Sequence, residues 1–413
     1  MRKQYSWIFK VFLMLPVVFS FFCGPKNAHQ KSTVTYEKDN VTYVENPASP
    51  NVVPPVYELK EILSVGGGGE SGEDENYVFV NPRRLAVDGN GHIYVMDSRK
   101  FSVSAFDEKG VFLRRYGRRG EGPGEFLLML DFAVDDQNRM LHILDLKHNK
   151  ISCFLPDGTL HSEIKIDKYA QRLFLPDRDI YYTVHRVYDE KDKELKNIIK
   201  YSRDGKKVAT SPTFPRSKHV KFQKNTVTHT LMPQFCALSI IANSPTGKIF
   251  WAMSDDYRFD VFNPVFQKVK IIKKDVSERV NVTIEEKEQF LKTVRGNLMR
   301  KGSDPSAIDS SIIDLLPDYY PIYYSFWFDG DGRLWVPLVK RDEQIQYIDI
   351  FDREGVFVET RVIKKPAGTL YLYDVFVKPI VKGDLVYAVV RDAEENWAVK
   401  VYRLVLQPGA VLK

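Results

Sequence analysis

The residues of this 413-residue sequence that are best suited to bind a ligand stand just before short apolar runs with the pattern of strands. They are Arg83, Arg84, Asp131, Arg172, Gln234, Tyr323, Tyr324, Tyr373 and Asp374. Arginine and tyrosine donate hydrogen bonds to carboxylates and other anions, and aspartate accepts them. The set therefore indicates a site for a polar or anionic ligand, or for a peptide segment.

Known catalytic motifs are absent from the sequence. It contains no H-E-x-x-H motif, no G-x-S-x-G motif and no Cys–His pair at a recognisable spacing. Asp131 and Asp374 could contribute to a metal site, but no complete set of ligands accompanies them. We therefore assign no catalytic residue, no metal ligand and no cofactor, and keep metal-assisted catalysis as the alternative to binding.

Residues 81–116 contain four short apolar runs separated by turn sequences. The runs are Arg84–Val87, His92–Met96, Phe101–Phe106 and Val111–Tyr116. Aspartate, asparagine and glycine between the runs favour tight turns. Four antiparallel strands of this kind form a meander sheet that is too small to bury its own faces. The unit therefore needs similar neighbours.

The same rhythm returns along the chain, which predicts an all-β fold made of repeated sheets. Further units cover residues of about 129–166, 170–211, 235–273, 323–363 and 370–405. The last unit has only three strands, at Leu370–Val377, Leu385–Val390 and Trp397–Leu404. An unpaired strand at Val56–Val65 could supply the fourth and close a ring. We expect a six-bladed β-propeller over residues 56–407, with this N-terminal strand completing the last blade.

An aspartate recurs at the end of the second strand in most units. The positions are Asp97, Asp145, Asp255, Asp342 and Asp392. Such a residue can accept a hydrogen bond from the backbone two positions later and fix a turn. A ring of metal ligands is the other interpretation, but these turns would lie in the body of each blade, so we expect turn formation.

Two insertions interrupt the repeats. Residues 211–234 are rich in lysine, arginine and histidine and could form a basic lid or a solvated loop. Residues 274–321, between blades 4 and 5, have a helical pattern that begins at a Thr283-x-x-Glu286 capping box. A second helix is expected from Asp304-Pro305 to Pro317. We expect this two-helix insertion to pack on the propeller, or else on a partner.

The N-terminus has the pattern of an export signal. Arg2 and Lys3 precede the uncharged apolar stretch Val11–Phe22, which is short for a membrane span. Cys23 follows directly and resembles the lipidation site of bacterial lipoproteins. An uncleaved anchor, or a signal peptide in which Cys23 is incidental, is the other interpretation. Residues 1–24 are thus the expected signal, and residues 25–55, which have few large apolar side chains, a flexible tether.

The charge and cysteine content limit the kinds of partner that we expect. The formal net charge of +6 arises from 60 basic and 54 acidic residues, and no concentrated basic helix or zinc framework accompanies it, so we expect no nucleic-acid partner. Cys153 and Cys236 lie in apolar runs and are expected to be buried free thiols. We expect a monomer.

A family resemblance rests on the best-preserved unit. Its residues are Pro82, Leu85-Ala86-Val87-Asp88, Gly91-His92-Ile93-Tyr94-Val95, Asp97, Phe106-Asp107, Gly110, Gly117, Gly120 and Gly122-Pro123-Gly124-Glu125-Phe126. This run resembles an NHL-type repeat, and more narrowly the exported six-bladed propellers of bacteria, many of them lipoproteins. The glycines from Gly117 onwards follow one strand and lead to another, so we interpret them as a crossover between blades.

The resemblance implies a non-catalytic binding or scaffold protein at the bacterial cell envelope. It would be anchored to the membrane through a lipid on Cys23, in the periplasm or at the cell surface. It would bind a protein, peptide or glycan through one face of the propeller, where the nine candidate residues are expected. The alternative that the fold implies is a metal-dependent hydrolase or lyase with its site on the propeller axis.

Overall fold

The computed structural model describes residues 32–48, 53–67, 74–136, 139–177, 179–190, 193–224, 227–342, 344–366, 378–391 and 396–408. The described residues belong to one compact unit, Ser32–Lys413. The expected export signal with Cys23 lies outside the described residues, as do Tyr373 and Asp374.

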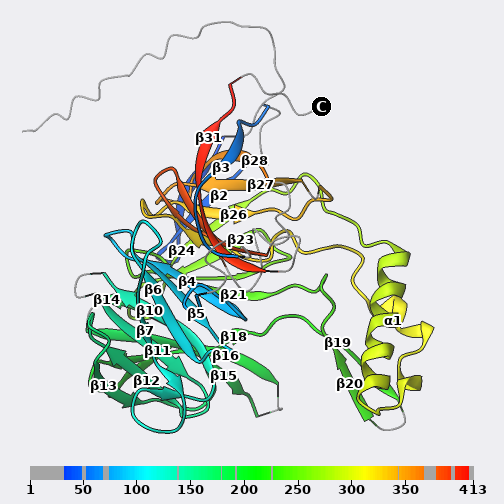
Figure 1. Cartoon of the computed structure of the whole chain (residues 1–413). Coiled ribbons are helices and arrows are strands. Elements are labelled where there is room, and N and C mark those ends of the chain that lie inside the picture. The colour runs from blue at the N-terminus through cyan, green and yellow to red at the C-terminus, as the bar shows by residue number, and fades with distance from the viewer. Residues whose placement is uncertain are drawn as a thin grey trace, which may run out of the picture. The chain divides into compact units, whose positions relative to one another are not determined.

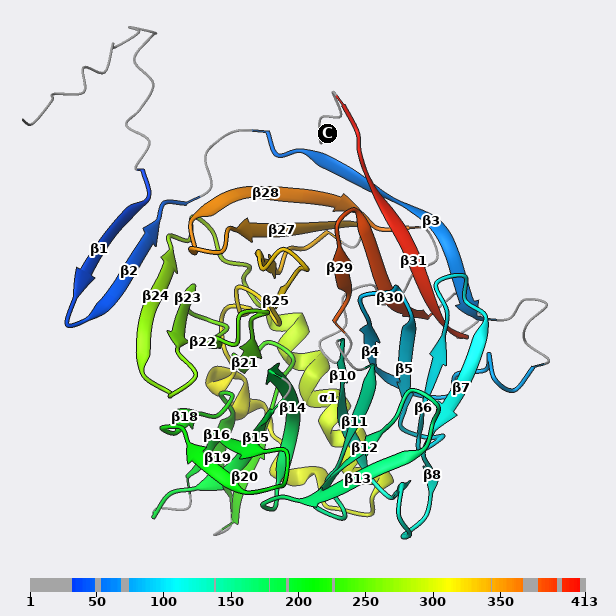
Figure 2. The same cartoon turned by 90° about the vertical axis from the view of Figure 1, so that its left-hand side faces the viewer.

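Most of the described chain forms four-stranded antiparallel meanders, which we name by their first strands (Figures 1 and 2). The β4 sheet contains β4 (Pro82–Val87), β5 (Ile93–Asp97), β6 (Ser102–Phe106) and β7 (Phe112–Tyr116). The β10 sheet contains β10 (Met129–Asp135), β11 (Met140–Asp145), β12 (Lys150–Phe154) and β13 (Leu160–Lys165). The β14 sheet contains β14 (Ala170–Asp177), β15 (Ile180–Tyr188), β16 (Glu194–Ser202) and β17 (Lys207–Thr210), and β18 (Phe214–Pro215) also pairs with β16.

The later repeats form the remaining large sheets. The β21 sheet contains β21 (Ser239–Asn243), β22 (Ile249–Met253), β23 (Arg258–Phe262) and β24 (Lys268–Lys274). The β25 sheet contains β25 (Trp327–Phe328), β26 (Leu334–Pro337), β27 (Ile345–Phe351) and β28 (Phe357–Lys364). The β29 sheet contains β29 (Ile380–Lys382), β30 (Leu385–Arg391), β31 (Trp397–Leu406) and β3 (Val56–Gly66).

Strand β3 supplies the outer strand of the β29 sheet, as the sequence predicts. It pairs antiparallel with β31 from Tyr57 to Gly66. Its first residues also pair in parallel with β28, so the β25 and β29 sheets are joined into one eight-stranded sheet. The first strand of the β29 sheet is Ile380–Lys382, later in the chain than the predicted Leu370–Val377, of which all residues lie outside the described part.

Burial explains why these small sheets assemble. The inner strands β5, β6 and β12 are buried along their whole length, whereas the outer strand β7 alternates between partly buried and exposed residues and is fully buried only at Tyr116. A strand buried on both faces must lie between two neighbouring sheets. Shared apolar clusters link the β4 sheet to the β10 sheet, the β10 to the β14, the β14 to the β21, the β21 to the β25, the β25 to the β29, and the β29 back to the β4 sheet.

The prediction of a flexible tether is wrong for residues 34–46. They form the hairpin β1 (Val34–Lys38) and β2 (Val41–Asn46), and β2 adds in parallel to the outer edge of β24. Val44 is buried in the cluster between the β21 and β25 sheets. The short β-branched and aromatic run from Val41 to Val44 suits an edge strand. The sequence does not predict this strand, because the segment around it has few large apolar residues.

The two insertions pack against each other. Residues Val220–Lys224 and Val227–Leu231 form the hairpin β19–β20, and α1 (Ile284–Arg300) begins at the expected capping box. Val220, Leu291 and Ile312 share one buried cluster, and Figure 1 shows the hairpin beside the helix. Residues 220–231 of the basic insertion are thus a packed hairpin and not a solvated loop. Instead of the expected second α-helix, the chain forms the 3-10 helices Pro305–Ala307 and Ser310–Leu315.

The recurring aspartates fix turns as expected at three of the five positions. Asp97, Asp145 and Asp342 each accept a hydrogen bond from the backbone two residues later. Asp97 and Asp145 also accept backbone N–H groups just before β4 and β10. These carboxylates therefore position the starts of the first strands. Asp255 instead pairs with Lys218 of the basic insertion, and Asp392 lies outside the described residues.

Two further features bear on the expectations. Cys153 and Cys236 are both free and buried, as predicted. Within the described ranges, no helix combines the length and the apolar character needed to span a membrane.

Candidate functional site

Three of the predicted residues occupy equivalent positions on neighbouring sheets. Arg84, Asp131 and Arg172 are each the first paired residue after an irregularity in the register of β4, β10 and β14. Figure 2 shows the first strands of the sheets around the centre. A bulge at this point redirects the side chain that follows it. The same local feature, repeated in consecutive sheets, directs three polar side chains towards one another.

Asp131 holds both arginines. Its Oδ1 atom lies 2.9 Å from Nε of Arg84, and its Oδ2 atom lies 3.1 Å from Nε of Arg172. The backbone N–H groups of Phe132 and Leu173 also donate to this carboxylate. The Asp131 side chain is only 5% exposed. The contacts join three sheets whose strands are about forty residues apart in the sequence.

Two lysines extend this group. Lys378 lies just before β29 and donates from Nζ to the carbonyl of Phe326, at 2.7 Å. Burial, with the nearby arginines Arg172 and Arg84, lowers the pKa of Lys378 to about 7. Lys196 of β16 donates to the carbonyl of Ser239, and burial together with Arg172 lowers its pKa to about 8. We call Arg84, Asp131, Arg172, Lys196 and Lys378 the axial cluster.

The remaining predicted residues lie elsewhere or are not described. Tyr323 is fully buried in the core between the β21 and β25 sheets and donates to the carbonyl of Asp256. Tyr324 donates to the carbonyl of Gln234, at 2.6 Å, which ties the ends of the two insertions together. Arg83 is exposed, and its carbonyl accepts a hydrogen bond from Arg84. Tyr373 and Asp374 lie outside the described residues.

The sequence pattern does not select Lys378, because it predicts the first strand of the last repeat at Leu370–Val377, whereas the first strand among the described residues is Ile380–Lys382. Lys378 precedes Pro379-Ile380-Val381 much as Arg84 precedes Leu85-Ala86-Val87. The pattern of a basic residue directly before a first strand therefore marks Lys378 as well. No comparable sequence pattern marks Lys196 as a residue of the site. It lies on a third strand and reaches the centre only because the β14 and β21 sheets are neighbours.

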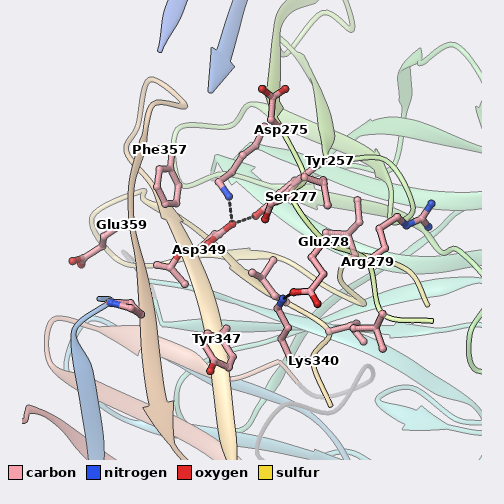
Figure 3. Close-up of a pocket in the computed structure, with 18 of the residues that line it drawn as sticks. Tyr257, Asp275, Ser277, Glu278, Arg279, Lys340, Tyr347, Asp349, Phe357 and Glu359 are labelled. Carbon is pink, nitrogen blue, oxygen red and sulfur yellow. Dashed lines mark hydrogen bonds and ion pairs between the residues drawn. The ribbon is translucent and has the colours of Figure 1, made fainter. Parts of the chain in front are cut away.

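A separate lateral cavity of about 500 Å³ lies between the end of β24 and strands β27 and β28 (Figure 3). Residues 53–55, 275–280, 320–322 and 338–340 complete its lining. Its volume is within the range typical of small-molecule sites. None of the axial cluster residues lines it.

A buried ion pair forms one side of the lateral cavity. Nζ of Lys274 lies 3.0 Å from Oδ2 of Asp349, and the hydroxyls of Tyr257 and Thr360 also donate to this carboxylate, each at 2.6 Å. Asp349 is inaccessible to solvent. The Lys274 ammonium lies 5.3 Å from the ring centre of Tyr257 and 4.6 Å from that of Phe357. Burial and the Asp349 carboxylate raise the pKa of Tyr257 well above its usual value.

The structure also brings together a cysteine and a histidine that sequence spacing did not reveal. Sγ of Cys153 lies 3.8 Å from Nε2 of His142 on the adjacent strand. Burial raises the pKa of the thiol to about 11, and burial together with Arg203 lowers the pKa of His142 to about 3. A buried thiol with a raised pKa is a poor nucleophile, so this pair does not supply a catalytic dyad.

The described residues provide no group of three or more His, Cys, Asp or Glu side chains placed to hold a metal ion. Asp131 was a candidate ligand for a metal on the axis, and its two oxygens are instead paired with guanidinium groups. Four cationic side chains in the axial cluster would repel a divalent cation and attract an anion. The donor set fits an anionic group.

The ring of meander sheets makes the protein a β-propeller. Residues 84–270 match the model of a family described as a domain of unknown function, DUF4934. A comparison with curated proteins returns no match.

One solved structure shares the fold at low sequence identity, and two others are similar at lower scores. A Bacteroides fragilis protein described as exported superposes with a TM-score of 0.53 and 13% identity, over 88% of this chain and 99% of that one. A DUF4221 family member from Bacteroides vulgatus gives a TM-score of 0.46 and 9% identity, over 85% and 99% of the two chains. Virginiamycin B lyase from Staphylococcus aureus gives 0.38 and 9%, over 84% and 88%. The last two TM-scores, both below 0.5, do not establish a shared fold.

Proposed function

We propose that this chain is a non-catalytic binding protein of the bacterial cell envelope that holds a carboxylate-bearing part of its ligand at the axial cluster. The ligand is a peptide or a glycan, and the shared chemistry is the carboxylate. The protein acts as a monomer and does not bind nucleic acid.

The observation that carries the proposal is the charge of the axial cluster. Among its five described residues, four have basic side chains and only Asp131 has a carboxylate, which pairs with the two arginines. The lowered pKa values of Lys378 and Lys196 reflect burial and the repulsion from the arginines. An anion placed among these groups would relieve that repulsion, and guanidinium groups suit carboxylates in particular. The cluster therefore favours an anionic ligand.

The cyclic order of shared clusters supports six blades, and the run from Pro82 to Phe126 supports a propeller of the NHL kind. In this interpretation β3 completes the last blade, and the segment containing α1 is an insertion between blades 4 and 5. Both insertions connect the outer strand of one sheet to the first strand of the next. They therefore belong to the end of the ring at which Arg84, Asp131 and Arg172 begin their strands, and would border the ligand.

Export and a lipid anchor at Cys23 complete the proposal. Their support is the apolar stretch Val11–Phe22 followed by Cys23, and the fold shared with a protein described as exported. Metabolic labelling with a tagged fatty acid tests the anchor. Label that is retained by a Cys23→Ser variant would overturn it.

The binding proposal is tested with the unit Ser32–Lys413 and two pairs of probes. An oligoglutamate peptide is compared with an oligoglutamine peptide, and an oligogalacturonate with a neutral oligoglucan, by calorimetry at low and high salt. We expect the acidic member of one pair to bind and its neutral counterpart not to bind. The pair that responds distinguishes a peptide from a glycan.

Charge-removing variants locate the site. Arg172→Met and Lys378→Met are expected to weaken binding roughly tenfold each, because each removes a charge-assisted contact. Arg118→Met and Lys206→Met remove the same charges from highly exposed positions elsewhere and serve as matched controls. Equal losses in the axial and control variants, or equal binding of acidic and neutral probes, would overturn the proposal.

A further inference from the structure

The lateral cavity shares no residue with the axial cluster, so it is a distinct feature of the molecule. It has an apolar side and a polar side. Val276, Ile322, Leu338 and Val339 contribute to the apolar lining. The polar side consists of the Lys274–Asp349 ion pair with its hydroxyl partners. A ligand that fits both sides has an apolar body and a polar end.

Aromatic rings border the polar side. Tyr257 and Phe357 flank the ammonium of Lys274, and Tyr320 and Tyr347 also line the cavity. Figure 3 shows Phe357, Tyr257 and Tyr347 around Asp349. Aromatic side chains provide large flat contact surfaces for ring-shaped or planar ligands.

Three cations (Lys274, Arg279, Lys340) and four carboxylates (Asp275, Glu278, Asp349, Glu359) line the cavity, and most of these charges have a partner within the protein. Besides Lys274 with Asp349, Lys340 pairs with Glu278 at 3.2 Å, and Glu359 pairs with Arg361 at 2.7 Å. The guanidinium of Arg279 lies over the ring of Tyr319. A charged ligand would meet groups whose charges are mostly paired already, and its own charge would lose hydration on entry. The cavity therefore favours an uncharged ligand.

The buried ion pair is also unusual for a purely structural element. Pairs of this kind are often replaceable by apolar residues without loss of stability. At the wall of a cavity, however, an ammonium group held in place by a buried carboxylate can orient the hydroxyl or carbonyl group of a ligand. Cavities with an apolar lining and a few placed polar groups are typical ligand sites.

We propose that the lateral cavity binds an uncharged small molecule with an aromatic or aliphatic ring body and a hydroxyl or carbonyl end on the polar side of the cavity, beside Lys274. The ligand lies between β24 and the strands β27 and β28, under residues 53–55 of the N-terminal segment. The site is independent of the axial cluster, because binding at one requires no residue of the other.

The test uses the uncharged fluorophore N-phenyl-1-naphthylamine with the purified unit Ser32–Lys413. We expect saturable binding of one molecule per chain, with enhanced fluorescence. Displacement then compares three compounds with the same body: 2-naphthol, 2-naphthoate and 2-naphthylmethylamine. At neutral pH the first is uncharged, the second an anion and the third a cation. We expect 2-naphthol to displace the fluorophore at a concentration at least tenfold lower than either charged compound.

A cavity-filling variant tests whether the fluorophore binds in the lateral cavity. Val276 lines the cavity and is 39% exposed, so Val276→Trp can fill the space without disturbing the core. Val265→Trp introduces the same side chain at a position that is 67% exposed and outside the cavity. We expect Val276→Trp to abolish fluorophore binding and Val265→Trp to leave it unchanged, with both variants melting within a few degrees of the parent protein.

Each other outcome overturns the proposal. These outcomes are the absence of saturable fluorophore binding, stronger displacement by the anion or the cation, and undiminished binding to Val276→Trp. If Val276→Trp unfolds, Val280→Trp at the same wall replaces it, and the displacement series decides independently. Acidic probes of the axial cluster should bind equally well to Val276→Trp, which separates failure of this proposal from failure of the axial one.

Discussion

Nζ of Lys274 lies 3.0 Å from Oδ2 of Asp349, and this contact joins the outer strand of the β21 sheet to the third strand of the β25 sheet. Both side chains are buried, and both line the lateral cavity. The same pair therefore contributes to the interface between two sheets and to the polar side of the proposed ligand site.

Removing one member of this pair is expected to destabilise the protein strongly. Lys274→Met leaves the buried carboxylate of Asp349 without its counter-ion, which costs about 3–5 kcal/mol of unfolding free energy. Chemical denaturation measures the loss. Lys207→Met, which breaks an exposed pair with Asp167, is the control and should cost at most about 1 kcal/mol. Similar losses for the two variants would contradict the structural role of the buried pair.

Asn46 connects the N-terminal hairpin to two sheets. Its Nδ2 donates to the carbonyls of Lys273 and Gly355, and its Oδ1 accepts from the N–H of Phe357. Asn46→Ala leaves these buried groups unsatisfied, so we expect a loss of about 1–3 kcal/mol. Asn90→Ala, at an exposed turn, is the matched control. A change in denaturation midpoint no larger than that of the control would show that the hairpin does not stabilise the ring.

The lowered pKa of Lys378 predicts a specific dependence of stability on pH. Burial and the axial arginines lower this pKa from 10.5 to about 7 in the folded protein. Between these values the unfolded chain binds the additional proton, so the contribution of this group to stability rises as the pH rises from about 7 towards 10.5. Lys378→Met should remove that rise. Denaturation midpoints across this pH range measure it, and identical slopes in the two proteins would contradict the prediction.

The same residue predicts proton uptake on ligand binding. An anion at the axial cluster raises the pKa of Lys378 from about 7, so binding above pH 7 should take up protons. Calorimetry in buffers of different ionisation enthalpy measures the number of protons bound. Affinity for the acidic probe should also fall as the pH rises above about 7, unless Lys378 is replaced by methionine.

Gly355 is predicted to tolerate no side chain. It adopts a φ of +89° in the turn between β27 and β28, and an added Cβ would overlap the side chain of Ile272 in the neighbouring sheet. Gly302 has a φ of +68° but faces open space. Both alanine variants incur the backbone cost, roughly 1–2 kcal/mol, and only Gly355→Ala adds overpacking of about 1–3 kcal/mol. Equal thermal shifts for the two would contradict this packing.

The two insertions, residues 211–234 and 274–321, form a module with its own apolar core. The stability of this insertion module can therefore be changed separately. Leu291 of α1 is buried among residues from both insertions, and Leu291→Ala should destabilise the module by about 2–5 kcal/mol. Limited proteolysis should then cut within residues 284–315 while the sheets stay protected. Leu315→Ala, at an exposed position, is the control. Cleavage spread evenly over the sheets would instead mean that module and ring unfold together.

Local patterns account for the part of the fold that was predictable. The four runs between Arg84 and Tyr116 alternate with turn sequences, and the strands β4 to β7 follow them closely. The unpaired strand at Val56–Val65 and the three-stranded last repeat together predicted the pairing of β3 with β31. The hairpin β1–β2 escaped prediction, because an edge strand that buries little apolar surface looks like a polar linker.

The axial candidates were predictable only in part. Placing residues before first strands found Arg84, Asp131 and Arg172, but it also selected Tyr323, which is a core residue. Position along a strand says which end of a sheet a residue occupies. It does not say whether the side chain points into a core, towards a neighbour or into solvent, and a bulge of one residue changes that direction.

The sequence thus determines the strands, their turns and the way the chain closes its last sheet, because these depend on neighbouring residues and on alternation over a few positions. The tertiary structure decides which distant side chains meet. Asp131 joins Arg84 to Arg172, Lys378 reaches the axial cluster from the last sheet, and Lys274 meets Asp349 beside a cavity. These contacts depend on how whole sheets pack around the centre. Sequence patterns over a few residues do not determine that packing.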